Sequence, residues 1–265
     1  MSPRLVEVLR TERLTEHMVR VVFRGDLDDF AVGAFTDHYV KIQFPPPGAQ
    51  YEAPFDAAAL KEQLPAEQRP RPRTYTVRRF DHERRELTID FVVHGDSGVA
   101  GPWAITAQPG DKLQLQGPGG AYAPRADADW HLLIGDDTVV PAIGATLERL
   151  PDSAVAHVIM AADEQPLSVP AGTTIHWVDD VRTAVDALDF PEGTPHVFLH
   201  GEASDVRAVR RHLLAERGIT RDGQSISGYW KRHRTEDGWR EDKAEWNRLI
   251  EQDDNTNQPS GGVIT

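Results

Sequence analysis

The chain contains no cysteine among its 265 residues. This absence excludes disulfide bonds, thiolate zinc sites, cysteine-bound iron–sulfur clusters and a thiol nucleophile. The 11 histidines form neither an HExxH motif nor an i, i+4 pair on a predicted helix. We therefore assign no metal site, and we expect any redox chemistry to come from a bound organic cofactor.

Long apolar runs and an excess of positive charge are also missing. No window approaches the roughly 20 apolar residues that a bilayer crossing needs, and the first five residues lack an apolar signal core. Lys and Arg total 29 against 42 Asp and Glu, so a formal net charge of -13 repels phosphate backbones and anionic lipids. We expect a cytoplasmic monomer with no membrane span and no nucleic-acid partner.

The length allows one large domain or two modest ones, at about 150 residues per domain. Up to about residue 124 the apolar residues have a period of two, and Gly, Pro and Asp bound the segments, which predicts antiparallel strands in a barrel or sandwich. The stretch 45–72 lacks a sustained period and is predicted to be a long excursion. The alternating apolar positions are Val19, Val21, Phe23, Val40, Ile42, Phe44, Leu87, Ile89, Phe91 and Val93.

After Asp129 short apolar runs alternate with helical patterns, as in a parallel sheet covered on both faces. One helix is predicted to end at Leu150, a second to begin at an N-cap Ser204, and a third to span 241–250. The tail from Asp253 is expected to fray. Strands are predicted at 132–134, 154–160, 174–178, 196–199 and 225–231. This pattern is typical of a nucleotide-binding domain.

The stretch 73–78 (Arg-Thr-Tyr-Thr-Val-Arg) places two guanidinia, a phenol and a hydroxyl on one predicted strand. Such a strand spans about 16 Å, which matches the reach from a flavin ring to its diphosphate. Arginine suits phosphate oxygens, tyrosine offers a flat ring, and threonine can bond a ring nitrogen. An exposed edge strand of charged and β-branched residues explains the same pattern.

A glycine-rich turn over residues 94–104 follows a strong strand and precedes a short helical pattern. Glycines let backbone N–H groups converge on an anion, and the start of a helix adds its positive dipole end. The turn is a candidate pyrophosphate cradle, although ordinary loops have the same composition. The two stretches together favour a flavin dinucleotide.

With these motifs the sequence resembles the siderophore-interacting protein family, which consists of FAD-dependent ferric-siderophore reductases of the ferredoxin-reductase-like superfamily. The resemblance covers nearly the whole chain. It is carried by residues 73–78, 90–95, 98–103, 117–120, 135–143, 199–202 and 228–231.

The resemblance implies an FAD-binding antiparallel β-barrel domain over residues 1–124 and an α/β parallel-sheet NAD(P)H-binding domain over 125–265. It implies that Arg73 contacts the FAD phosphates, Tyr75 the isoalloxazine or ribityl face, and Thr76 the flavin N5 edge. It makes Arg78 a further cofactor or strand-bracing contact. Strand parity places Thr76 and Arg78 on the face opposite Arg73 and Tyr75. The remaining implied FAD-binding residues are His94, Gly98, Val99, Ala100, Gly101 and, beside the adenine, Trp103.

For the electron donor, NADH or NADPH, the resemblance points to Asp136, Thr138, Gly201 and Glu202 near the nicotinamide. No GxGxxG fingerprint is present at the first strand-to-helix turn of this half. Asp163 and Glu164 lie where ribose recognition favours NADH, whereas Arg182 would favour NADPH. Ordinary acidic loop ends explain the two carboxylates equally well. The sequence leaves this choice open.

A ferric siderophore is the substrate that the resemblance implies. Lys41, Lys231 and Arg232 are candidates for a basic patch that attracts an anionic chelate, although each also fits a solvated surface charge. Some family members have an arginine at the position of Gly119, which this chain lacks. No nucleophile or acid–base pair is identified, so we assign no catalytic residue. The alternatives are a flavin reductase with another acceptor and a non-catalytic ferric-siderophore-binding protein.

Overall fold

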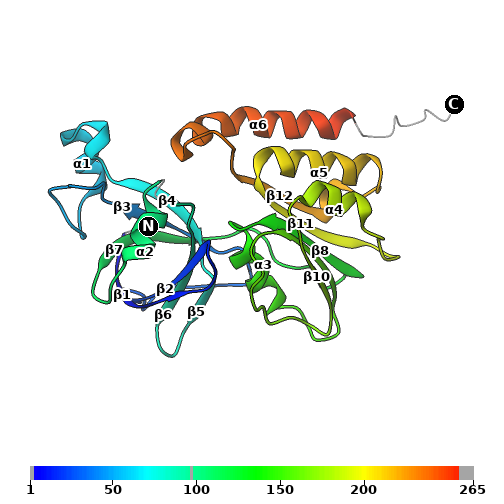
Figure 1. Cartoon of the computed structure of the whole chain (residues 1–265), viewed down its shortest axis with the longest axis horizontal. Coiled ribbons are helices and arrows are strands. Elements are labelled where there is room, and N and C mark those ends of the chain that lie inside the picture. The colour runs from blue at the N-terminus through cyan, green and yellow to red at the C-terminus, as the bar shows by residue number, and fades with distance from the viewer. Residues whose placement is uncertain (1–2, 96–97, 257–265) are drawn as a thin grey trace. The chain divides into compact units, whose positions relative to one another are not determined.

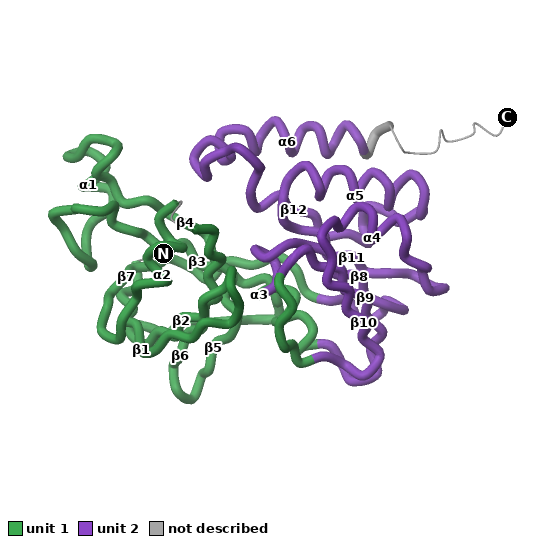
Figure 2. Tube along the Cα trace, viewed as in Figure 1, with its two compact units in different colours: residues 1–123, 141–149, 163–168 green, residues 124–140, 150–162, 169–265 purple. Residues whose placement is uncertain are grey.

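The computed structural model describes residues 3–95 and 98–256. The chain divides into two compact units, which Figure 2 distinguishes by colour. Unit 1 comprises residues 1–123, 141–149 and 163–168, and unit 2 comprises residues 124–140, 150–162 and 169–265. Two short segments from the second half of the chain therefore belong to the unit built by the first half.

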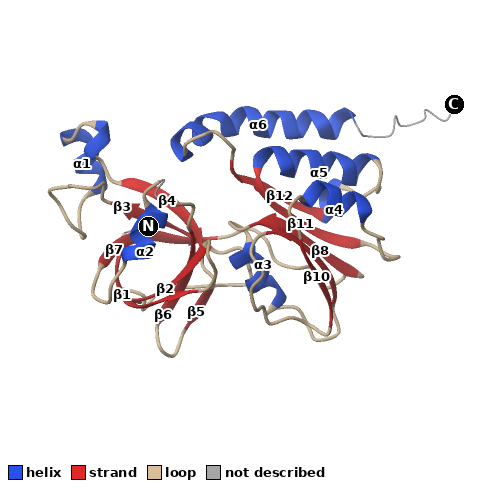
Figure 3. Cartoon of the chain, viewed as in Figure 1, coloured by secondary structure: helices blue, strands red, loops and turns tan. Residues whose placement is uncertain are grey.

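Unit 1 is built on a seven-stranded antiparallel sheet with the order β4-β3-β7-β1-β2-β6-β5 (Figures 1 and 3). The sheet curls into a barrel-like shape, as predicted. Its strands are β1 (Arg4–Arg13), β2 (Met18–Gly25), β3 (Tyr39–Phe44), β4 (Arg71–Thr76), β5 (Arg79–Asp81), β6 (Glu86–Val92) and β7 (Lys112–Gly119). Its helical segments are α1 (Ala57–Gln63), the 3-10 turn η1 (Ala66–Gln68) and α2 (Ala100–Thr106).

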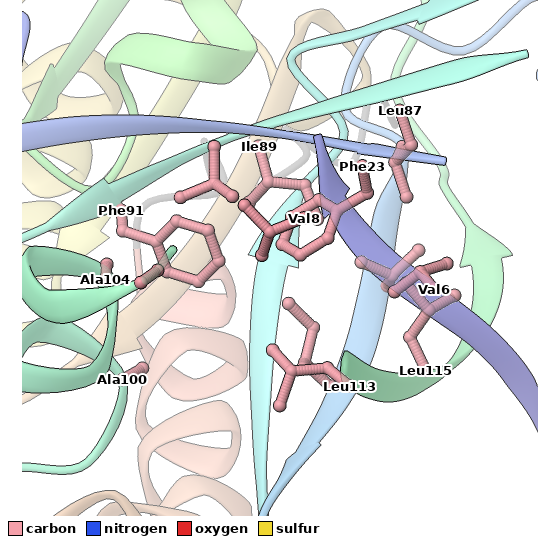
Figure 4. Close-up of a cluster of buried hydrophobic side chains, with 14 of the residues drawn as sticks. Val6, Val8, Phe23, Leu87, Ile89, Phe91, Ala100, Ala104, Leu113 and Leu115 are labelled. Atoms are coloured by element: carbon pink, nitrogen blue, oxygen red, sulfur yellow. The ribbon is translucent and has the colours of Figure 1, made fainter. Parts of the chain in front are cut away.

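The core of unit 1 confirms the period-two pattern. All ten alternating positions predicted from the sequence are at most 4% exposed. Phe23, Ile89 and Phe91 meet Val6, Val8 and the residues of β7 inside the barrel (Figure 4). Burial of each such side chain contributes about 1.5–3 kcal/mol, so this pattern fixes which face of each strand points inward.

The excursion at 45–72 contains α1 and η1, which the aperiodic sequence did not predict. Helix α1 forms locally because the Asp56 carboxylate caps it, accepting from the backbone N–H groups of Ala58 at 2.9 Å and Ala59 at 3.1 Å. The buried Gln114 amide in β7 holds both backbone polar groups of Phe55, at 2.9 and 3.0 Å.

Unit 2 contains the predicted parallel sheet, with the strand order β10-β9-β8-β11-β12. Helices α4 and α5 pack on one face, where Val185, Val206 and Leu213 contact the strands, and the opposite face is also buried at Leu133 and Phe198. The strands are β8 (Trp130–Asp136), β9 (Val155–Ala161), β10 (Gly172–Trp177), β11 (Pro195–Glu202) and β12 (Gln224–Trp230). The helical segments are α3 (Val140–Leu147), α4 (Val181–Ala187), α5 (Ala203–Ala215), η2 (Arg221–Gly223) and α6 (Glu236–Thr256).

Three predicted helix ends in this half are wrong. The N-cap of α5 is Glu202 rather than Ser204, because the longer carboxylate reaches back to the N–H groups of Ser204 and Asp205. Helix α3 ends at Leu147, before the predicted Leu150. Helix α6 starts before 241 and continues through Asp253, where fraying was expected, and residues 257–265 of that tail lie outside the described residues. No helix in the described part of the chain is long and apolar enough to cross a bilayer.

Candidate functional site

The register of β4 against β3 decides which side chains of the 73–78 stretch share a face. Arg73 lies opposite Ile42, and Tyr75 lies opposite Val40. Both partners are fully buried on the inner face of the barrel. Directly opposed residues in an antiparallel pair point to the same side, so Arg73 and Tyr75 face inward. The predicted parity is therefore observed.

Tyr75 and Arg73 remain accessible although they face the core. The Tyr75 ring is half-buried, and its centroid lies 4.5 Å from that of Phe91 at an interplanar angle of 45°. The half-buried Arg73 guanidinium donates to the carbonyl of Pro72 at 2.8 Å. A flat ring and a guanidinium thus follow each other along one inward face of β4.

Thr76 lies on the other face of β4, opposite Tyr39, and is buried. Its side chain cannot point to the same side as Tyr75, so its predicted contact with the flavin N5 edge must involve the backbone or a bend beyond the strand end. Such a bend is present, because the Val77 N–H leaves the ladder and donates to the His38 carbonyl at 2.6 Å.

The glycine turn leads into α2 with open space on its outer side. Gly98 has φ +84°, and no atom lies within 4 Å of the place where a Cβ would stand. The N-cap residue Val99 has no side-chain acceptor, and α2 begins at Ala100. His94 is exposed, with its ring centroid 6.3 Å from that of His17. Two residues of the predicted cradle, Asp96 and Ser97, lie outside the described residues.

Trp103 ties α2 to the barrel. Its ring stacks on Phe23 at 6.2 Å with an interplanar angle of 7°, and contacts Phe44 at 5.6 Å and Phe91 at 5.7 Å. These contacts place it in the aromatic cluster under the cradle, and its proposed proximity to adenine stays a prediction. Because Phe91 also meets Tyr75, the cluster connects the inward face of β4 with the glycine turn.

The side chains of β4 and the backbone of the glycine turn together fit FAD. A dinucleotide flavin carries a flat apolar ring system and a dianionic diphosphate. The inward face of β4 offers a half-buried phenol ring next to a guanidinium. Gly98 leaves room for an anion to approach the backbone two residues before α2 begins.

Arg78 is a strand-bracing residue. Its guanidinium forms two bonds with the Glu148 carboxylate, at 2.5 and 3.1 Å, and lies 4.0 Å from Asp90. Arg20 binds Asp90 through two further bonds of 2.7 and 2.8 Å. The network attaches residues 141–149 to the barrel. These ion pairs account for the position of Arg78 without the cofactor contact that was also predicted for it.

Asp136 is half-buried at the end of β8, and its carboxylate accepts hydrogen bonds from several surrounding residues. One carboxylate oxygen accepts from the Thr138 N–H at 2.9 Å and the Thr138 hydroxyl at 2.5 Å. The other accepts from the Glu202 N–H and the Trp230 indole N–H, both at 2.8 Å. Burial raises the pKa of Asp136, and the four bonds oppose that rise without cancelling it. The usual four acceptor positions of a carboxylate are thus used, so Asp136 positions the turn rather than offering a free acceptor to a dinucleotide.

Gly201 and Glu202 complete the same edge of the sheet. Gly201 has φ +127°, and a Cβ there would lie 2.6 Å from the Asp136 carboxylate. The Glu202 carboxylate accepts from the N–H groups of Ser204 and Asp205, at 2.8 and 2.9 Å, and from the Arg232 N–H at 3.1 Å. Glu202 therefore caps α5, a role that the sequence did not predict.

Replacing Gly201 by alanine is expected to lower the free energy of unfolding of unit 2 by at least about 3 kcal/mol, because the new Cβ strains the backbone and displaces the Asp136 carboxylate. Urea unfolding followed by tryptophan fluorescence measures the loss. Gly218→Ala is the matched control: its φ is +64°, but its Cβ meets open space, so about 1 kcal/mol is expected. Equal losses in both variants would contradict the close approach at Gly201.

The predicted basic patch is less positive than the sequence suggests. Lys231 lies 3.7 Å from Asp242, and Arg232 forms ion pairs with Glu202 at 3.3 Å and with Asp205. Lys41 is exposed on β3. Two of the three cations are therefore partly neutralised by carboxylates, and the role of all three in a substrate-binding patch stays a prediction.

The two residues weighed for the choice of donor are also engaged. Asp163 accepts from the ring Nδ1 of His17 at 2.9 Å and from its backbone N–H at 3.3 Å. Arg182 forms an ion pair with Asp205 at 2.7 Å. These contacts hold residues 163–168 on unit 1 and α4 on α5, and the part of either residue in the choice between NADH and NADPH stays a prediction.

A buried polar cluster on β11 and β12 was not identified from the sequence. The His200 ring bonds the Tyr229 hydroxyl and the Ser225 hydroxyl, both at 3.0 Å, and stacks on Phe198 with centroids 3.9 Å apart. Burial lowers the pKa of His200 to about 3. A histidine directly after the buried Leu199, inside a continuous apolar run, was the available signal.

Both halves of the chain match models of known protein families. Residues 7–122 match the family model described as siderophore-interacting FAD-binding domain, and residues 128–233 match the model described as siderophore-interacting protein.

Named relatives match over nearly full length. Ferric vibriobactin reductase ViuB of Vibrio cholerae is 34% identical, with 91% of this chain and 94% of that protein covered. NADPH-dependent ferric-chelate reductase of Escherichia coli is also 34% identical, with 86% and 92% covered. The crystal structure of the siderophore-interacting protein SipS from Aeromonas hydrophila superposes with a TM-score of 0.78 at 30% identity, covering 93% of this chain and 98% of that one.

Proposed function

Because the chain belongs to the siderophore-interacting protein family, we propose that it is an FAD-dependent reductase that uses NAD(P)H to reduce ferric siderophores and release ferrous iron. The observation that carries this proposal is the inward-facing pair Arg73 and Tyr75, within the segment that matches an FAD-binding domain. The contacts of Phe91 with Tyr75 and Trp103 connect this pair with the helix that follows the glycine turn. The names of the Vibrio cholerae and Escherichia coli relatives support the ferric substrate, and the latter favours NADPH as donor.

When bound, FAD supplies the conversion between a two-electron hydride donor and single-electron transfer. In the net reaction one NAD(P)H yields two electrons and one proton, and two ferric ions become ferrous. Ferrous iron is held less tightly by hard oxygen ligands, so it leaves the chelate.

The protein contributes position and charge. Arg73 binds the diphosphate, Tyr75 packs against the flavin, and the backbone of Gly98 to Gly101 (Gly98, Val99, Ala100 and Gly101) donates to the phosphates. Thr76, His94 and Trp103 lie around them. In unit 2, Asp136 fixes Thr138, Gly201 and Glu202 at the carboxyl ends of β8 and β11, the edge where nucleotides bind in parallel sheets.

The substrate side of the proposal rests on charge. Lys41, Lys231 and Arg232 attract the anionic chelate. The carboxylate partners of Lys231 and Arg232 partly neutralise the charge of these two residues. The working boundary between the FAD-binding and NAD(P)H-binding domains is placed at residues 124 and 125. We also place the protein in the cytoplasm as a monomer.

Steady-state reduction tests the proposal. The FAD-loaded protein is supplied with NADPH or NADH and a ferric siderophore, and ferrous iron is captured by a chromogenic chelator. The proposal predicts ferrous iron formation that requires protein, flavin and nucleotide together. Rapid nucleotide oxidation with free flavin or quinone but without ferrous iron indicates a reductase for another acceptor. Tight chelate binding without nucleotide oxidation indicates a sequestering protein.

A further inference from the structure

We infer that Arg71 is a second phosphate-binding arginine, which holds the AMP-side phosphate of FAD while Arg73 holds the phosphate on the riboflavin side. This inference rests on the proposed flavin function and adds a residue that determines which flavin the protein prefers.

The register places Arg71 in line with the proposed flavin contacts. It lies opposite the buried Phe44, as Arg73 lies opposite Ile42 and Tyr75 opposite Val40. All three side chains therefore leave the same inward face of β4. Successive members are about 6.7 Å apart along a strand, so the order of ring, first guanidinium and second guanidinium matches the order of ring, first phosphate and second phosphate in FAD.

The local environment of Arg71 indicates an anionic ligand. Its side chain is half-buried, yet among residues 3–95 and 98–256 it has no hydrogen bond or ion pair. Its neighbour Arg69, by contrast, donates to the Leu64 carbonyl at 2.8 Å. Partial burial of an unpaired cation is unfavourable, and binding of a phosphate removes that penalty.

The aromatic cluster connects Arg71 with the glycine turn. Its cross-strand partner Phe44 contacts Trp103 at 5.6 Å, and Trp103 belongs to the first turn of α2, directly after the glycines. Arg71 lies on the side of Arg73 away from Tyr75, and Phe44 links it to the helix that follows the glycine turn.

The sequence also stiffens this position. Arg71 stands between Pro70 and Pro72, and proline fixes its own φ near -65° and keeps the preceding residue extended. The alternation of arginine and proline keeps the arginines on one face of the strand. Proline is tolerated here because β4 is an edge strand of the seven-stranded sheet. A pre-ordered guanidinium loses less conformational freedom on binding.

Flavin affinities test the inference without any turnover. Dissociation constants of FAD, FMN and riboflavin for the apoprotein are measured by flavin fluorescence quenching in wild type, Arg71→Gln, Arg71→Lys and Arg73→Ala. FMN has only the phosphate on the riboflavin side. Arg71→Gln is therefore expected to weaken FAD binding about tenfold or more while changing FMN binding less than about twofold. Arg71→Lys is expected to recover part of the loss, and Arg73→Ala to weaken both nucleotides.

The matched control is Arg84→Gln, which removes an exposed guanidinium from the turn between β5 and β6 of the same unit. Its FAD affinity is expected to equal that of wild type, and circular dichroism checks that every variant is folded. Wild-type FAD affinity in Arg71→Gln, or equal weakening of FAD and FMN, would overturn the inference and leave the proposed reductase intact. Failure of the wild type to bind any flavin would instead refute the proposed function.

Discussion

Replacing Arg73 by alanine is expected to weaken FAD binding about 10- to 100-fold, so that the protein is purified largely without flavin. The half-buried guanidinium lies on the same inward strand face as Tyr75. A charge-assisted hydrogen bond contributes about 1.5–3 kcal/mol, which corresponds to this range in the dissociation constant. Flavin absorbance per protein after purification, followed by FAD titration of the apoprotein, measures the effect.

Two comparisons make the Arg73 result specific. Riboflavin has no phosphate, so its weaker binding is expected to be unchanged by Arg73→Ala. Arg84→Ala removes an exposed charge from the same unit and is expected to retain flavin like the wild type. Full flavin retention in Arg73→Ala would show that the phosphates are bound elsewhere.

The second large effect concerns acid stability of unit 2. Burial is the main cause that lowers the pKa of His196 to about 4 and of His200 to about 3, from an ordinary value of 6.5. His196 accepts from the Arg125 N–H at 3.1 Å through Nδ1, and a neutral ring suits that bond. Burial also lowers the pKa of His131, whose ring lies 6.3 Å from that of His196.

The sign of the effect follows from proton binding. Well above pH 6.5 these rings are neutral in both states. Between pH 6.5 and the lowered values, the unfolded chain binds protons that the folded chain does not, so the free energy of unfolding falls as the pH falls. At pH 5, His196 and His200 each account for a loss of about 2 kcal/mol relative to neutral pH, and His131 adds to it.

Urea unfolding at pH 7.5 and pH 5.0 measures this loss. Tryptophan fluorescence reports mainly on unit 2, because tryptophans 130, 177, 230, 239 and 246 lie there and only Trp103 lies in unit 1. His200→Gln is expected to remove about 2 kcal/mol of the difference between the two pH values, whatever its effect on absolute stability. The exposed His82→Gln is expected to leave the difference unchanged. A His200→Gln protein with the full pH difference would contradict the buried neutral ring.

The strands were predictable because burial of one face makes apolar residues alternate with outward-facing residues in the sequence. Val19, Val21 and Phe23 alternate with outward residues, and all three are buried. Parity along β4 similarly predicted that Arg73 and Tyr75 share a face. Such patterns depend on neighbours within a few residues.

Contacts between residues far apart in the sequence produce no comparable local pattern. Asp136 and Glu202 matched a family motif, yet their carboxylates bind Trp230 and Arg232, which lie near the other end of unit 2. The bracing of Arg78 by Glu148 spans 70 residues. A side chain whose partner lies so far away in the sequence has the same local pattern whether it binds a ligand or another part of the chain.

Electron transfer through a bound flavin is tested most directly by absorbance under anaerobic conditions. The protein loaded with FAD is titrated with NADPH and separately with NADH, and a ferric siderophore is then added. We predict that at least one nucleotide bleaches the flavin band, and that the ferric siderophore restores it with two ferrous ions formed per nucleotide oxidised. A band that neither nucleotide bleaches, or a bleached band that the ferric siderophore does not restore, would contradict the account.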